Sequence, residues 1–296
     1  MILERQKLVL ALLAANGGTL DRVDFQKLLF LFTQQCEQKP SYEFVPFKKG
    51  CFSFTAMADK RGLVKKGLLA DSEDWQLTEV GKGKADVIPK DLRWKLTLFS
   101  DRRKQLRGDS LVASVYRAYP YWATHSRIAP SVLAGDDAAL VAIEKARSVR
   151  AVSVLCSIGY EGRSLEGYLN ALLKAGVSVL CDVRKNAFSR KFGFSKAMLA
   201  SVCPDLGVRY EHMPDLGIES GERQKLNELA DYQRLFRKYE RTVLPLQTNA
   251  LERIAAWVRS GECVALTCFE RLPEYCHRTR IARAVEKRIG KKTIDL

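Results

Sequence analysis

The segment VSVLCDVRKN, residues 177–186, is an apolar run that ends in charged residues, and it sets the pattern of the second half of the chain. The same form recurs in AVSVLCSIGYEG (151–162), GVRYEHMPDLG (207–217) and CVALTCFERL (263–272). Helical patterns lie between these runs, and the closing GKKTIDL predicts one more strand. Strands that alternate with helices are typical of a parallel sheet covered on both faces. We therefore predict a three-layer parallel α/β domain over residues 149–296.

The first part of the chain has a different pattern. RQKLVLALLAANGG (5–18) places apolar residues at helical intervals and ends at a Gly-Gly stop. TLDRVDFQKLLFLFTQQC (19–36) predicts a second helix with Thr19 or Asp21 as its cap. Alternating aromatic residues then predict a small β-element in YEFVPF (42–47).

Helices with a small β-element predict an N-terminal helical, winged-helix-like domain over residues 1–90. This segment also resembles antitoxin-like and phage-associated winged-helix domains of the Panacea type, through FQKLLFL, YEFVPFKKGCFSF and LTEVGK. The resemblance implies a role in recognition and supplies no catalytic residue. Residues 91–148, which contain the basic run DRRKQLR, are expected to form a helical connector.

Positive charge is spread over the whole chain. The net charge is +15, with 25 lysine and arginine residues against 17 acidic residues before residue 151 and 24 against 17 after it. A basic tail would have concentrated this excess, whereas two basic halves favour one extended polyanion as partner. We therefore expect nucleic acid, and DNA in particular, to be the partner.

The sequence also bears on compartment and cofactors. No apolar run reaches the length of a membrane span, so we expect no membrane association. The N-terminus has no cleavage-site signature and is predicted to be a folded helix rather than a signal peptide. Cysteines within apolar runs, without a Cys-x-x-Cys pair, are typical of a reducing cytoplasm. We predict no cofactor, because neither a G-x-G-x-x-G motif nor a P-loop occurs.

The candidate site lies where the four predicted strands end, because ligands of open parallel sheets bind at the carboxyl ends of the strands. Polar or reactive residues follow all four strands: Tyr160 and Arg163 after the first, Asp182, Arg184, Ser189 and Arg190 after the second, Tyr210 and His212 at the third, and Cys268, Glu270, Cys276, His277 and Arg278 after the fourth. We expect these side chains to line a single cleft that attracts negative charge.

The segment CFERLPEYCHRTRIARAVEKR (268–288) combines several chemistries at a strand-to-helix junction. A helix N-terminus with Arg278 beside it predicts an anion site, for which Cys276 and His277 are further candidates. A thiol at such a junction has a lowered pKa, so a Cys268 or Cys276 thiolate with His212 or His277 as base is a second hypothesis. The six-residue Cys-to-Arg spacing of rhodanese and phosphatase loops is absent, which disfavours sulfur transfer and phosphotyrosine chemistry.

Two further chemistries involve the acids and the metal-ligand types. Asp182 and Glu270 are candidate acid/base groups for a reaction at a sugar carbon, although Asp182 paired with an arginine would only organise the site. Cysteine and histidine side chains are also zinc ligand types. Their spacing matches no zinc pattern with paired short intervals, so we assign no metal.

The second half resembles the bacterial and archaeal family called domain of unknown function 488. The resemblance rests on SIGYEGRSLEGYLNALLKAGVSVLCDVRKNAFSRKFGFSKAML, LGVRYEHMPDLGI and ALTCFERLPEYCHRTRIA, and it implies a fold and a site but no reaction. Where the family usually has a proline before its Ser-Arg pair, this chain has Ala187-Phe188. The resemblance implies these signature positions: Asp182, Arg184, Ser189, Arg190, Tyr210, Leu216, Gly217, Cys268, Glu270, Cys276, His277 and Arg278.

These observations lead to one functional hypothesis and two alternatives. The first is a cytoplasmic, nucleic-acid-associated protein, a DNA-processing or defence-linked enzyme that acts on a nucleotide or base at the strand ends. The second is a binding module that senses a nucleotide or modified base without turnover. The third is a thiol enzyme that acts on a small anionic substrate.

Overall fold

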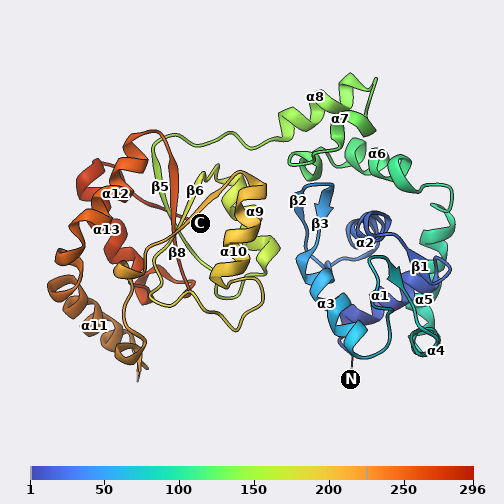
Figure 1. The fold of residues 1–296 in the computed structure, drawn as a ribbon, viewed down its shortest axis with the longest axis horizontal. Helices are drawn as coiled ribbons and strands as arrows, with labels where there is room; N and C mark the ends of the chain where they lie inside the picture. The colour runs from blue at the N-terminus through green and yellow to red at the C-terminus, as the bar shows by residue number, and fades with distance from the viewer. Residues whose placement is uncertain (1, 225) are drawn as a thin grey trace. The chain divides into compact units, whose positions relative to one another are not determined.

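The computed structural model describes residues 2–224 and 226–296, and the chain divides into two compact units, Met1–Arg147 and Ser148–Leu296. Each unit has its own hydrophobic core. No helix among the described residues is both long enough and apolar enough to span a membrane. The two units are described separately below (Figure 1).

The first unit is mainly helical. Its helices are α1 (Glu4–Ala14), α2 (Arg22–Cys36), α3 (Phe54–Lys65), α4 (Glu79–Asp86), α5 (Lys90–Asp101), α6 (Gly108–Ala118), α7 (Ala129–Val132) and α8 (Asp137–Ala146). Two short antiparallel pairs accompany them: β1 (Thr19–Leu20) with β4 (Trp75–Gln76), and β2 (Val45–Phe47) with β3 (Gly50–Phe52). The assignment of this unit to the winged-helix class stays a prediction.

Local sequence explains how the first unit is organised. Asp21 caps α2, because its carboxylate accepts hydrogen bonds from the backbone amides of Val23 at 2.6 Å and Asp24 at 3.0 Å. Phe25 of α2 stacks on Trp75 of β4 at 3.5 Å between ring centroids. The helices of residues 90–146 contribute apolar side chains to this same core and do not form a separate connector layer.

The second unit contains a parallel sheet with the strand order β7-β6-β8-β5-β9 among the described residues. Its strands are β5 (Val154–Gly159), β6 (Val179–Asp182), β7 (Arg209–His212), β8 (Cys263–Cys268) and β9 (Ile294–Asp295). All residues of β6 and β8 are buried, which accounts for the mainly apolar sequences of both strands. The parallel α/β class and the strand in GKKTIDL are thus confirmed.

Helices cover both faces of this sheet (Figure 1). One face carries α9 (Leu165–Lys174) and α10 (Lys196–Val202), and the other carries α11 (Leu229–Thr242), α12 (Thr248–Arg259) and α13 (Arg278–Ile289). The chain therefore leaves β5 and β6 toward one face, whereas it leaves the intervening strand β8 toward the opposite face. Such a reversal opens a crevice at the carboxyl ends of the strands.

Candidate functional site

A pocket of about 360 Å³ lies at the carboxyl ends of the strands, and we call it the strand-end pocket. Its lining comes from the segments that follow β5, β6, β7 and β8. Five basic residues line it, and no acidic residue does among the described residues of the lining. These basic residues are Arg184, Lys185, Arg190, Lys191 and Arg223.

The loop after β6 supplies most of this lining, and short polar side chains shape it. The carboxamide oxygen of Asn186 accepts a hydrogen bond from the backbone amide of Phe188 at 3.0 Å. The hydroxyl of Ser189 accepts one from the backbone amide of Lys191 at 3.2 Å. These local bonds shape the turn around Ala187-Phe188, and Arg190 is exposed at the pocket.

Arg184 is held at the pocket wall by a buried ion pair. Its Nε donates to Asp182 Oδ1 at 2.8 Å and its Nη2 to Asp182 Oδ2 at 2.5 Å. Asp182 Oδ2 also accepts a hydrogen bond from the hydroxyl of Tyr210 at 2.6 Å. Burial first, and then the charge of Asp182, raise the pKa of Tyr210, so its hydroxyl keeps its proton. Asp182 is itself fully buried and therefore organises the site from behind the wall.

Aromatic side chains form another part of the pocket. Tyr160 stacks on Phe194 with ring centroids 4.4 Å apart, and its hydroxyl accepts a hydrogen bond from Arg184 Nη1 at 2.9 Å. Phe188 and Phe269 also line the pocket and remain 72% and 41% exposed. Two large apolar rings held in solvent beside a basic pocket offer flat surfaces to a ligand.

The strand ends approach one another closely at Gly159. A Cβ atom at this position would lie 1.9 Å from the carbonyl oxygen of Glu270. Only glycine lets the end of β5 pass so near the loop after β8. This contact fixes Tyr160 and Phe269 next to each other, with ring centroids 5.3 Å apart.

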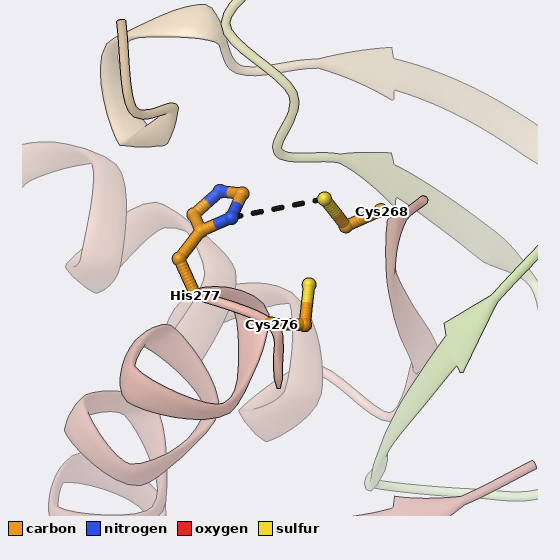
Figure 2. A group of neighbouring side chains, drawn as sticks. All are labelled: Cys268, Cys276 and His277. Carbon is orange, nitrogen blue, oxygen red and sulfur yellow. Dashed lines mark hydrogen bonds between the residues drawn. The ribbon is translucent and has the colours of Figure 1, made fainter. Parts of the chain in front are cut away.

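A second group of reactive side chains lies buried at the end of β8 and the start of α13. We call Cys268, Cys276 and His277 the Cys-His cluster, and Figure 2 shows both sulfur atoms and one ring nitrogen of His277 facing a common space. Cys268 Sγ lies 3.7 Å from His277 Nδ1. His277 Nε2 lies 3.0 Å from the carbonyl oxygen of Val183, which can only accept, so this nitrogen carries a proton.

The two thiols of the Cys-His cluster differ in how readily they lose a proton. The hydrogen bond from Cys276 is the largest factor that lowers the pKa of Cys268, and His277 lowers it further. Burial would lower the pKa of His277, but the charge of Cys268 and its hydrogen bond outweigh burial and raise it. Burial raises the pKa of Cys276. Cys268 is thus the thiol of this cluster that favours the thiolate form.

Glu270 and Arg223 connect the Cys-His cluster to the strand-end pocket. Glu270 Oε2 lies 3.5 Å from Cys268 Sγ, and Glu270 Oε1 accepts a hydrogen bond from Arg223. Burial raises the pKa of Glu270, and Arg223 opposes that shift. Since Arg223 lines the pocket, the cluster lies behind the part of the pocket wall that this arginine forms.

The structure separates the site residues expected from the sequence into groups. Tyr160, Arg184, Ser189 and Arg190 line the pocket. Asp182, Tyr210 and His212 lie behind the pocket wall, where His212 Nε2 is 2.9 Å from the carbonyl oxygen of Arg184. Cys268, Glu270, Cys276 and His277 form the buried group.

Two expected phosphate-binding residues lie elsewhere. Arg278 is buried, and its guanidinium donates to the hydroxyl of Ser157 at 3.0 Å and to the carbonyl oxygens of Glu270 and Arg271. It holds the loop after β8 instead of facing the pocket. Arg163 donates to the carbonyl oxygen of Leu296 at 2.8 Å and is also absent from the pocket lining.

Sequence reasoning missed several pocket residues. Lys185 and Lys191 are direct neighbours of Arg184 and Arg190 in the segment after β6, so their position at a strand end is the signal that could have found them. Phe188 and Phe269 carry no such signal, because apolar residues are ordinarily expected in the core. Arg223 lies in the 3-10 turn Ser220–Arg223, for which no periodic pattern gave a signal.

Comparison with known proteins gives one match. Residues 164–285 match the family described as domain of unknown function DUF488. This match confirms the resemblance of the C-terminal segment, and it spans β6, β7 and β8 together with most of the pocket lining. Neither a curated protein nor a solved structure gave a significant match. The antitoxin-like resemblance of the first unit stays a prediction.

Proposed function

We propose that the strand-end pocket binds the phosphate of a nucleotide, free or within a nucleic-acid strand, and that the protein is nucleic-acid-associated. The observation that carries this proposal is the convergence of five basic side chains in one pocket without an acidic residue among its described lining. Arg184, Lys185 and Arg223 are also paired with acids outside the lining. This leaves Arg190 and Lys191 as the cations there without an ion pair among the described residues. Phosphate is the biological anion that such an arrangement favours. The net charge of +15 supports a partner larger than a single nucleotide.

Two exposed aromatic rings further restrict the class of ligand that fits the pocket. Phe188 and Phe269 stand at the same pocket as the cations, so one ligand would bring a negative group and a flat apolar group together. A nucleotide has both. Stacking of a base on an aromatic side chain contributes about 1–3 kcal/mol and tolerates any base.

Binding is favoured over carboxylate catalysis by the state of the two acids. Asp182 is paired with Arg184 and Tyr210, and Glu270 is paired with Arg223. Neither carboxylate lines the pocket. A general base needs to come within hydrogen-bond reach of a bound substrate. The proposed activity is therefore recognition of a nucleotide or base, which is the binding-module alternative that the sequence left open.

The test is the salt dependence of nucleic-acid binding by the full chain. Fluorescence anisotropy with single-stranded and duplex DNA should give a steep fall in affinity with salt, and each lost phosphate contact should reduce the logarithmic slope by about 0.7–0.9. Arg190→Ala should reduce the slope by one such contact. Arg237→Ala changes an exposed arginine of α11 outside the pocket and is the matched control. A flat salt response, or equal effects of both substitutions, would contradict the proposal.

A further inference from the structure

The Cys-His cluster has the composition of a metal site. We infer that Cys268, Cys276 and His277 bind one zinc ion, with the carboxylate of Glu270 as fourth ligand. The two thiols and the imidazole are all buried, and their ligand atoms lie within 4.8 Å of one another. Thiolate, imidazole and carboxylate are the ligands that zinc takes in proteins.

The distances fit a tetrahedral ion. Zinc–sulfur and zinc–nitrogen bonds of about 2.3 and 2.05 Å place a sulfur and a nitrogen ligand about 3.6 Å apart around one ion. Cys268 Sγ and His277 Nδ1 are 3.7 Å apart. A sulfur and an oxygen ligand are expected at nearly the same separation, and Cys268 Sγ and Glu270 Oε2 are 3.5 Å apart. The three cluster atoms are close enough for one ion, whereas Glu270 lies outside the group of ligand atoms within 4.8 Å of one another, so its carboxylate has to move toward them to become the fourth ligand.

Hydrogen bonds outside the cluster orient two of the four ligands. His277 donates through Nε2 to the carbonyl oxygen of Val183, which leaves the lone pair of Nδ1 directed toward the two sulfurs (Figure 2). A backbone carbonyl that fixes the far nitrogen is a usual support for a metal-binding histidine. Arg223 bonds to Oε1 of Glu270, and Oε2 is the oxygen nearest Cys268.

The charges of the buried groups balance once a divalent cation has bound and both thiols have released their protons to solvent. Two thiolates and one carboxylate carry three negative charges, and Arg223 supplies one positive charge. A zinc ion supplies the remaining two, so the buried group becomes neutral. Neutrality matters because an unbalanced buried charge costs several kcal/mol in a folded protein.

The sequence spacing concealed this site. Closed zinc sites usually have ligand pairs at short intervals, whereas Cys268 ends a strand and Cys276 precedes a helix. The 3-10 turn Pro273–Tyr275 turns the connection so that Cys276 and His277 return to the end of β8. Metal-ligand proximity here is a product of the tertiary fold.

The first experiment measures metal in the full-length wild-type chain. Elemental analysis of protein purified under reducing conditions without chelator should give one zinc per chain. After chelation under reducing conditions, added Co²⁺ should produce thiolate-to-cobalt charge-transfer bands and the visible bands of a tetrahedral ion. A reduced wild-type chain that takes up neither Zn²⁺ nor Co²⁺ overturns the inference. A Cys268–Cys276 disulfide in freshly isolated protein, seen by intact mass without reductant, also overturns it.

The second experiment assigns the ligands. Cys276→Ser should lower the affinity for Co²⁺ more than about tenfold, since even the outer partners of metal ligands contribute 10- to 100-fold. Cys203→Ser is the matched control, because Cys203 is equally buried but lies outside the cluster. Equal loss of metal in both variants overturns the assignment. If Cys276→Ser does not fold, the same comparison is made with Glu270→Gln. This variant should bind Co²⁺ more weakly and alter the visible spectrum of the bound ion. An unchanged affinity and spectrum would overturn the assignment of Glu270 as fourth ligand.

Discussion

Gly217 lies against the backbone of Lys185, so that a Cβ atom on Gly217 would be 2.1 Å from the backbone nitrogen of Lys185. The two residues belong to the connections that follow β7 and β6. Both connections contribute side chains to the strand-end pocket. The close approach therefore fixes the relative position of two pocket walls, and a side chain at residue 217 would force them apart.

Gly217→Ala is expected to destabilise the second unit and to weaken ligand binding. Overpacking of this kind costs about 1–3 kcal/mol of unfolding free energy. Urea denaturation, monitored by hydrogen exchange of peptides from the second unit, measures the change. Gly221→Ala is the control, since a Cβ there meets no atom within 4 Å. Equal stability of both variants would show that the contact is not a constraint.

Asp182→Asn should lower the unfolding free energy of the second unit by about 3–5 kcal/mol, because it leaves the Arg184 guanidinium buried without a counter-charge. The new amide would also direct N–H donors at the N–H donors of Arg184. The same urea measurement applies. Glu252→Gln removes the partner of an exposed pair with Arg259 and should cost about 0–1 kcal/mol. Similar losses in both variants would contradict an organising role for Asp182.

The fold of the second unit could be predicted because strands that are buried on both faces have short, mainly apolar sequences. The six residues of β8, Cys263–Cys268, are all buried, and five of them are apolar or cysteine, with Thr267 as the exception. The strand-end rule then places Tyr160, Arg184 and Arg190 in one region, since parallel strands end at one edge of the sheet. Neither inference requires knowledge of side-chain orientation.

Side-chain orientation accounts for most of what could not be predicted. Phe269 lines the pocket, whereas its neighbours Cys268 and Glu270 interact with each other in the buried group. In an extended chain, successive side chains point to opposite sides, so Phe269 would face away from Cys268 and Glu270. Extending the strand geometry of β8 by two residues would therefore have predicted this separation. The burial of Arg278 had no such signal, because an arginine is ordinarily expected in solvent.

The stability of the first unit should depend on pH in a way that shows the lowered pKa of Lys27. This lysine is buried in α2, and its Nζ donates to the carbonyl oxygens of Lys49 at 2.6 Å and Cys51 at 3.2 Å. Burial lowers its pKa, with the charge of Lys49 acting in the same direction and Cys51 and Asp24 opposing it. Between the lowered pKa and the unfolded value of about 10.4, the unfolded chain binds a proton that the folded chain does not.

The contribution of Lys27 to the unfolding free energy should therefore increase with pH between its lowered pKa in the folded chain and its pKa in the unfolded chain. Lys27→Met removes this contribution, so the stability of wild type minus that of the variant should increase with pH. Urea denaturation, monitored by hydrogen exchange of peptides from the first unit, measures this difference in stability. The comparison is repeated in a Cys51→Ala background, which removes the titration of the neighbouring thiol. A difference that does not change with pH would contradict the lowered pKa.

Phe188 should contribute to nucleic-acid binding through stacking and not through charge. Its ring is 72% exposed at the strand-end pocket, so Phe188→Ala should weaken binding of single-stranded DNA by about 1–3 kcal/mol and leave the salt slope unchanged. Phe188→Trp should preserve affinity. Leu246→Ala, at an apolar residue that is 79% exposed outside the pocket, is the control. An abasic oligonucleotide separates the two contributions, because it keeps the phosphates and removes the bases. If Phe188→Ala weakens binding of the abasic and the normal strand equally, the ring does not stack on a base.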